Sequence, residues 1–269
     1  LIDTRGCLFC SERGSGEFAG NKEKDIQSQI KEQINFLSKK WKTNSYIAYF
    51  QSYTNTYAPV EILKKKYYEA LNYENVKGLA IATRPDCINK DIIELLKEIN
   101  EKFFLWVELG LQTIHENTAK IIRRGYDLKI FERTINMLEN AGIKTVVHLI
   151  IGLPYETKGQ ILESISYISQ KNIWGLKLHL MHVLKNTDLE KYFYETSFKI
   201  LDKNEYVNII CDSLEILPPE IVIHRVTGDG KKSELITPRW SLDNLRVLSE
   251  IDKELKNRNS WQGKKQIKY

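Results

Sequence analysis

Short apolar runs alternate along the chain with segments whose apolar residues recur at three- and four-residue steps, and this alternation constrains the fold more than any other feature. Apolar runs of strand length occupy residues 45–50, 78–83, 104–110, 145–151 and 173–180. Buried strands that alternate with amphipathic helices are typical of parallel sheets built from βα units. The sequence therefore predicts an α/β fold in which five strand–helix units follow one another with short links.

The intervening segments carry the periodicity and the end signals of helices. One apolar stripe at helical spacing consists of Ile26, Ile30, Ile34, Leu37 and Trp41. Asn89 and Asp127 can cap the starts of two further helices, because their side chains accept backbone N–H bonds there. Gly142 can end the second of these helices, and residues 156–171 form the next one.

The pattern changes toward the C-terminus. A helix from about residue 204 is broken by Pro218-Pro219, and residues 221–226 read as another strand. Ser241 can cap a last amphipathic helix. The apolar stripe of that helix is predicted to be Leu242, Leu245, Leu248, Ile251 and Leu255. We expect residues 201–269 to form a small α/β extension rather than an independent domain.

Composition indicates an ordinary globular protein. The chain has 269 residues, of which 42% are hydrophobic and 28% charged. It shows no apolar run long enough to span a bilayer and no visible signal peptide, although it starts with Leu1 rather than methionine. The net charge of +5 gathers partly at 64–66, 231–232 and 264–265. These lysines are typical of solvent-exposed surfaces. The alternative is that they form a surface for an anionic partner such as tRNA.

Cysteine usage favours a reducing, cytosolic location without a membrane partner. Of the four cysteines, only Cys7 and Cys10 are close in sequence, and Cys87 and Cys211 read as isolated core or surface thiols. The segment Gly6-Cys7-Leu8-Phe9-Cys10 is typical of part of an iron–sulfur site. Two thiolates do not complete such a cluster, and the alternative of a structural zinc half-site would need a second ligand pair.

Polar clusters follow each of the five predicted strands. They are residues 51–55, residues 83–86, Glu108 with Gln112, residues 152–154, and His179 with His182. Parallel βα folds place functional residues at the C-terminal ends of their strands. Five such clusters in register predict a single site at one face of the sheet.

Several motifs together resemble the radical S-adenosylmethionine (SAM) enzymes, over essentially the whole chain. They are the segment 6–10 with the glycine-rich segment 14–20, then residues 49–57, 83–86, 108–113 and 224–230. Within that family the chain resembles the small bacterial branch related to the radical SAM domain of the Elongator catalytic subunit. The resemblance implies a partial (β/α)6 TIM-like barrel of parallel strands over residues 1–200, with the extension 201–269 packed on it. It also implies that the first strand and the first cluster cysteine lie upstream of residue 1.

The resemblance further implies two cofactors, a [4Fe–4S] cluster held by three cysteines and SAM bound at its open iron. Cys7 and Cys10 match the last two cluster ligands. Positions that match SAM-binding residues are Gln51, Ser52, Glu108, Gln112, Arg124, Gly152 and Leu184. In this assignment Arg124 pairs with the SAM carboxylate and Gln112 bonds the ribose. Glu108 has an equally weighted alternative, a core ion pair with Arg84.

Four residues are expected to face the substrate: Tyr53, His148, His179 and His182. A structural role is the alternative for each histidine. Asp229 and Arg225 are assigned to a lid or a subunit contact.

The activity implied is reductive SAM cleavage to a 5′-deoxyadenosyl radical that abstracts hydrogen from a modified nucleobase. The favoured substrate is a free base, which would make the protein a queuine lyase that returns queuine to its aminomethyl-deazaguanine precursor. The alternatives are a tRNA wobble-base modification enzyme and a non-catalytic iron–sulfur or RNA-binding module. An electron donor of the flavodoxin or ferredoxin type is expected, and a homodimer is a further option.

Overall fold

The computed structural model describes residues 6–10, 20–21, 23–228, 230 and 232–266. Asp229 and the glycine-rich segment before Gly20 therefore lie outside the described residues. The chain divides into two compact units. The β1–β3 unit comprises residues 13–110 and 130–145, and the β4–β7 unit comprises residues 1–12, 111–129 and 146–269.

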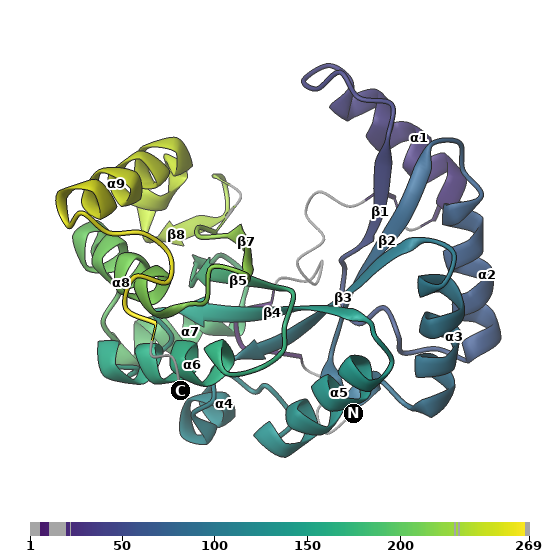
Figure 1. Ribbon diagram of the computed structural model, residues 1–269. Helices are drawn as coiled ribbons and strands as arrows, with labels where there is room; N and C mark the ends of the chain where they lie inside the picture. The colour runs from purple at the N-terminus through teal and green to yellow at the C-terminus, as the bar shows by residue number, and fades with distance from the viewer. Residues whose placement is uncertain (1–5, 11–19, 22, 229, 231, 267–269) are drawn as a thin grey trace. The chain divides into compact units, whose positions relative to one another are not determined.

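The strands are arranged in two sheets (Figure 1). They are β1 (Tyr46–Phe50), β2 (Val76–Thr83), β3 (Phe104–Gln112), β4 (Lys144–Ile151), β5 (Gly175–Leu180), β6 (Val183–Leu184), β7 (Val222–Arg225) and β8 (Leu235–Thr237). The larger sheet has the order β1-β2-β3-β4-β5-β7, and β6 pairs with β8 in the smaller one. Within each unit the pairs are parallel, β1 with β2 and β2 with β3, then β4 with β5 and β5 with β7. This sequential parallel order confirms the predicted α/β class with the connectivity of a partial (β/α)6 barrel.

The helices follow the strands in alternation. They are α1 (Ile26–Leu37), α2 (Val60–Leu71), α3 (Lys90–Asn100), α4 (Glu116–Ile121), α5 (Leu128–Asn140), α6 (Lys158–Ser169), α7 (Asp188–Thr196), α8 (Lys203–Ile216) and α9 (Asn244–Asn257), with short 3-10 turns at Pro85–Cys87 and Arg239–Leu242. Asn89 caps α3 as predicted, accepting from the Ile92 N–H at 3.0 Å. Gly142, at φ +67°, follows α5 as predicted. No helix among the described residues is long and apolar enough to cross a bilayer.

One face of the β1–β3 sheet carries the core of its unit. Leu79, Ile81 and Leu105 alternate toward this face and are fully buried. Figure 1 shows α2 and α3 beside these strands, and both helices bury apolar stripes. Gly78 is required by the close pairing of β2 and β3, because a Cβ there would lie 2.0 Å from the Phe104 carbonyl oxygen.

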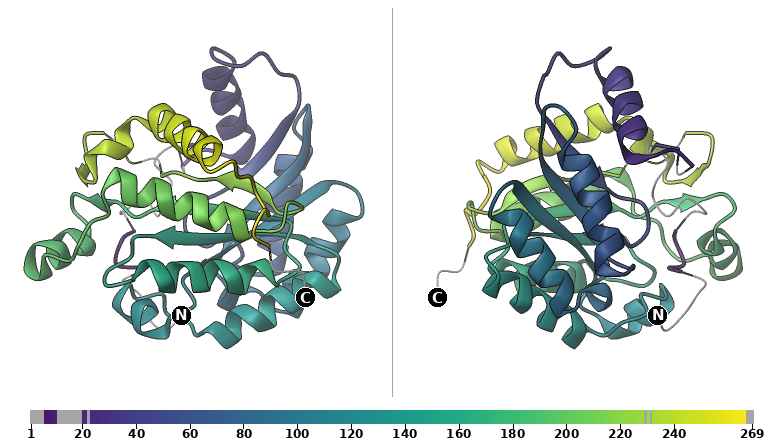
Figure 2. Two further views of the ribbon diagram at one scale, coloured as in Figure 1. Left: turned by 60° about the vertical axis from the view of Figure 1, so that its left-hand side comes forward. Right: turned by 90° about the vertical axis from the view of Figure 1, so that its right-hand side faces the viewer.

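One face of the β4–β7 sheet is largely apolar. Val147 and Leu149 of β4 and Leu176 and Leu178 of β5 are at most 1% exposed. Figure 2 shows α6 and α8 running alongside these strands. The strand β7, which the sequence analysis placed in the C-terminal extension, adds in parallel to β5 and so belongs to the main sheet.

The last helix begins later than predicted, and a different residue caps it. Asp243 is the N-cap of α9, accepting from the Arg246 N–H at 3.1 Å, whereas Ser241 lies in the preceding 3-10 turn. The predicted stripe is confirmed only in part, since Ile251 is buried whereas Leu245 and Leu248 are exposed. Leu245 is 81% exposed, and Val247 and Ile251 are the buried residues of this helix.

Candidate active site

The Cys7–Cys10 segment forms a tight turn in the β4–β7 unit. The Cys10 N–H donates to the Cys7 carbonyl at 3.1 Å, and both cysteines are half-buried. Leu8, between them, is 8% exposed and packs in a cluster with Ile122 and Leu189. The turn therefore carries two half-buried thiols, and the buried Leu8 side chain anchors the turn to this unit.

Backbone hydrogen bonds hold Leu8 on both sides. Its N–H donates to the Ile122 carbonyl at 2.9 Å, and its carbonyl accepts from the Leu189 N–H at 2.8 Å. These partners follow α4 and lie in the first turn of α7. Since both polar groups of Leu8 are satisfied, the register of the turn against this unit is fixed.

The donor chemistry of the turn fits an iron–sulfur cluster, because thiolates are the ligands such clusters require. Among the residues that the structure describes, no group of three or more His, Cys, Asp or Glu side chains could hold a metal ion. Cys87 and Cys211 are buried, and this burial raises the pKa of each thiol to about 11. They suit packing rather than ligation, so Cys7 and Cys10 are the ligand candidates.

The end of β3 carries Gln112 in a left-handed conformation with φ +62°. A backbone in this region is costly for a residue other than glycine and is commonly maintained at functional sites. The Gln112 side-chain oxygen accepts from the Tyr126 hydroxyl at 3.2 Å. Tyr126 itself stacks beneath the Arg124 guanidinium, 4.9 Å from its ring centre.

Arg124 is buried, with 1% exposure, and its guanidinium is directed at the protein. Its donors bind the carbonyls of Thr113 at 2.6 Å and Leu111 at 3.3 Å, on either side of Gln112. They also bind the Tyr126 carbonyl at 2.8 Å and the Glu116 carboxylate at 2.8 Å. These contacts give Arg124 a structural role that the sequence did not indicate, whereas its pairing with the SAM carboxylate stays a prediction.

Glu108 lies on the β1–β3 sheet, 2% exposed. Its carboxylate accepts from the Tyr49 hydroxyl at 2.6 Å and from the Trp106 indole N–H at 2.9 Å. The Arg84 guanidinium pairs in bidentate fashion with Asp86, at 2.9 and 2.8 Å, and the alternative of an ion pair between Glu108 and Arg84 stays a prediction. Glu108 therefore joins a polar group with two aromatic side chains that the sequence analysis did not single out.

The loop after β1 carries Gln51, Ser52 and Tyr53. Gln51 and Ser52 are half-buried, whereas Tyr53 is 67% exposed and has φ +57°. Asn55 ties this loop to the sheet, since its side-chain amide donates to the carbonyls of Phe50 at 3.0 Å and Ala82 at 2.9 Å. The loop is thus fixed at its base, with a strained residue at its exposed position.

The opposite face of the β4–β7 sheet carries polar side chains beside Val146 and Ile150. His148 and His179 lie there with ring centres 5.0 Å apart. The register pairs His148 with Lys177, and Lys177 is 9% exposed. Lys177 and His179 share this face because they are two residues apart on β5. β4 and β5 thus bring two imidazoles and one ammonium group together on this face.

A third histidine extends this face. Gly175 leaves room for His224 of β7, because a Cβ at residue 175 would lie 2.6 Å from that imidazole ring. Lys177 was not predicted from the sequence, and His224 was noted only as part of the motif 224–230, without a role. The period-2 alternation of β5, which puts Lys177 on the same face as His179, is the signal that could have identified Lys177.

His182 is packed among structural elements. Its Nε2 lies 2.9 Å from the Ser241 hydroxyl, and Cβ atoms at Gly228 or Gly230 would meet its ring at 2.8 and 3.0 Å. These contacts favour the structural alternative for His182.

The remaining predicted SAM residues of this unit lie at strand ends. Gly152 directly follows β4, has φ +88° and is buried. Leu184 is in β6, and its carbonyl accepts from the Thr187 hydroxyl at 2.7 Å. Convergence of the strand-end loops on one cavity stays a prediction.

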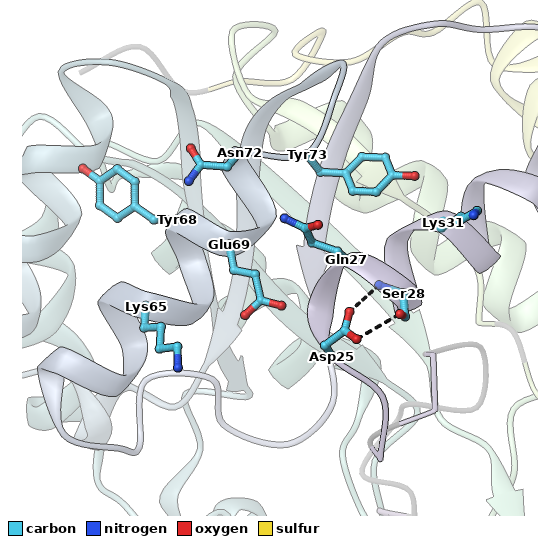
Figure 3. Close-up of a pocket in the computed structure, with 9 residues that line it drawn as sticks. All are labelled: Asp25, Gln27, Ser28, Lys31, Lys65, Tyr68, Glu69, Asn72 and Tyr73. Carbon is cyan, nitrogen blue, oxygen red and sulfur yellow. Dashed lines mark hydrogen bonds between the residues drawn. The ribbon is translucent and has the colours of Figure 1, made fainter.

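An open groove of about 770 Å³ lies between α1 and α2 of the β1–β3 unit (Figure 3). It contains none of the predicted site residues. Its lining is Asp25, Gln27, Ser28, Lys31, Lys65, Tyr68, Glu69, Asn72 and Tyr73. The Asp25 carboxylate caps α1 through the Ser28 N–H, and Glu69 binds the Ile26 N–H at 3.0 Å. These acidic groups thus already fix the start of α1.

Comparisons with known proteins agree with the class of enzyme that this parallel sheet and cysteine turn define. The radical SAM superfamily model matches residues 4–168, and a radical SAM C-terminal domain model matches residues 173–257. The chain belongs to the radical SAM superfamily. Its cofactors are those of that family, a [4Fe–4S] cluster and SAM.

The chain is also similar to individual proteins. The uncharacterized protein YtqA of Bacillus subtilis is 45% identical over 96% of this chain and 80% of its own length. Elongator complex protein 3 of Schizosaccharomyces pombe is 28% identical over 64% of this chain and 31% of its own. The solved structure of Elp3 from the archaeon Methanocaldococcus infernus shares the fold, with TM-score 0.75 and 18% identity over 88% of this chain and 60% of that one.

Proposed function

We propose that this protein abstracts hydrogen from a modified nucleobase, and that free queuine is the base, which makes it a queuine lyase. The observation that carries the proposal is the cluster of His148, Lys177 and His179 on one face of β4 and β5, opposite the buried Val147, Leu149, Leu176 and Leu178. Polar groups collected on a half-buried face are typical of a site. A nucleobase offers carbonyl and ring-nitrogen acceptors to such donors.

The residues of the chain have distinct tasks in this proposal. Cys7 and Cys10 ligate the cluster, held by the backbone bonds of Leu8. As the family resemblance implies, Gln112 and the loop of Gln51, Ser52 and Tyr53 are assigned to SAM binding, together with Glu108, Gly152 and Leu184. When bound, the cofactors supply the reductive cleavage of SAM that starts hydrogen abstraction. His148, His179 and Lys177 orient the base and exclude water from it.

A small substrate also agrees with the charge of the protein. The net charge is only +5 among 40 basic and 35 acidic residues. Cysteine usage favours a reducing cytosol, where the electron donor that radical SAM enzymes need would be of the flavodoxin or ferredoxin type. A homodimer stays a prediction.

The test is to incubate the complete reconstituted protein with SAM, a reductant and either queuine or bulk tRNA. We expect 5′-deoxyadenosine and the aminomethyl-deazaguanine base with queuine, detected by mass spectrometry. Turnover on tRNA with queuine inert would overturn the choice of substrate. Failure to form 5′-deoxyadenosine with either substrate would overturn hydrogen abstraction from a nucleobase.

A tRNA substrate is the second candidate, favoured by a basic groove of about 500 Å³ in the β4–β7 unit. Its lining includes Lys203, Lys232, Arg239 and Arg246 beside Trp240, with Asp243 as its acidic residue. Lys203 and Arg246 share the Glu250 carboxylate, at 2.6 and 3.0 Å. Part of the positive charge is therefore compensated, which is why this candidate is second.

Charge reversal in this groove separates the two candidates. If tRNA binds there, Lys232→Glu with Arg239→Glu should weaken tRNA binding and reduce the salt slope by about 0.7–0.9 for each phosphate that is no longer neutralised. Lys97→Glu, on α3, is the matched control. Equal tRNA affinity in all three proteins would remove this candidate.

A further inference from the structure

We propose that the ion pair between Arg123 and Asp188 is a clamp that positions the Cys7–Cys10 turn. The inference rests on the proposal that this turn ligates the cluster. Both residues lie outside the ligand set and belong to the same unit as the turn. They are therefore positioning residues for the cluster site.

Arg123 and Asp188 are sequence neighbours of the two residues whose backbones bind Leu8. Leu8 donates to the carbonyl of Ile122, the residue before Arg123, and accepts from the N–H of Leu189, the residue after Asp188. The turn is therefore held between two backbone segments. Anything that lets these segments separate breaks one or both bonds of Leu8.

The side chains of Arg123 and Asp188 form an ion pair that links these two backbone segments. The guanidinium Nη2 of Arg123 lies 2.5 Å from Oδ2 of Asp188. Their side chains are 18% and 44% exposed, so solvent screens the pair only in part. The pair joins the end of α4 to the first turn of α7, the two helices next to the bonds of Leu8.

The backbone of Arg123 supports a role for its side chain. Arg123 has φ +54°, just after the end of α4. Glycine is the usual residue in this left-handed position at a helix end, since any Cβ is strained there. An arginine is accommodated at a local conformational cost, and the contact with Asp188 gives a physical reason for its presence.

Arg123→Gly tests the clamp because it removes the side chain and also relieves the backbone. A merely stabilising role would lower the melting temperature, whereas the clamp predicts an unchanged or higher melting temperature with a looser turn. Asp188→Asn breaks the pair from the other side at nearly constant volume. Lys191→Gln is the matched control, since Lys191 lies 3.8 Å from Asp188 with a 78% exposed side chain.

The measurement is hydrogen exchange of the Leu8 and Leu189 amides in the complete, metal-free protein, followed by iron content after reconstitution. We expect exchange to be about fivefold faster in Arg123→Gly and Asp188→Asn, with less iron bound, and to be unchanged in Lys191→Gln. Wild-type exchange in both variants, undiminished iron, or an equal effect in Lys191→Gln would overturn the clamp. Because exchange is measured without metal, this result is independent of whether Cys7 and Cys10 ligate a cluster.

Discussion

Arg124 stabilises the segment that carries Gln112, because its guanidinium binds three backbone carbonyls and one carboxylate. Arg124→Ala leaves these acceptors buried without their donor, so we expect a loss of about 2–4 kcal/mol in the free energy of unfolding. Urea denaturation measures this loss, and the exposed Arg133→Ala is the control. A loss below about 0.5 kcal/mol, the usual size of a surface substitution, would show that these contacts are dispensable.

The two cysteines of the turn should behave differently from the two in the core. Cys7→Ala and Cys10→Ala should each abolish the absorbance and magnetic-resonance signals of the reconstituted cluster, because each removes a thiolate ligand. Cys87→Ala should keep those signals, since Cys87 is buried with a raised pKa. A full four-iron cluster in both turn variants would contradict the ligand assignment.

The strands could be predicted from the sequence because their apolar runs report burial directly. The five predicted runs overlap β1 to β5, with ends shifted by one or two residues. The start of α9 could not be predicted in this way, since Ser241 and Asp243 are both good caps. The Ser241 hydroxyl is hydrogen-bonded to the His182 ring and the Pro238 carbonyl. Only the tertiary structure reveals these contacts.

A pair of substitutions within the predicted stripe of α9 tests which of its residues are buried. Ile251 is 5% exposed and Leu245 is 81% exposed. Ile251→Ala should therefore lower the free energy of unfolding by about 2–4 kcal/mol. Leu245→Ala should change it by less than about 0.5 kcal/mol. Chemical denaturation of both variants is the measurement, and equal losses would show that the helix packs through the predicted stripe.

The predicted site residues are divided between the two units of the protein. Gln51, Ser52, Tyr53 and Glu108 belong to the β1–β3 unit, and the others to the β4–β7 unit. Sequence analysis could place them at strand ends, because parallel strands put functional residues there. The bonds of Arg124 depend on how the segment from β3 to α5 folds back on itself, and the pairing of His148 with Lys177 depends on the register of β4 and β5. Neither could be predicted from the sequence.

The central claim is that the Cys7–Cys10 turn makes this protein a radical SAM enzyme. It is tested most directly by measuring 5′-deoxyadenosine after the complete, anaerobically reconstituted protein is mixed with SAM and a reductant. We predict SAM-dependent 5′-deoxyadenosine from the wild-type protein and none above background from Cys7→Ala. A wild-type protein that holds four irons yet forms no more 5′-deoxyadenosine than Cys7→Ala would contradict the claim.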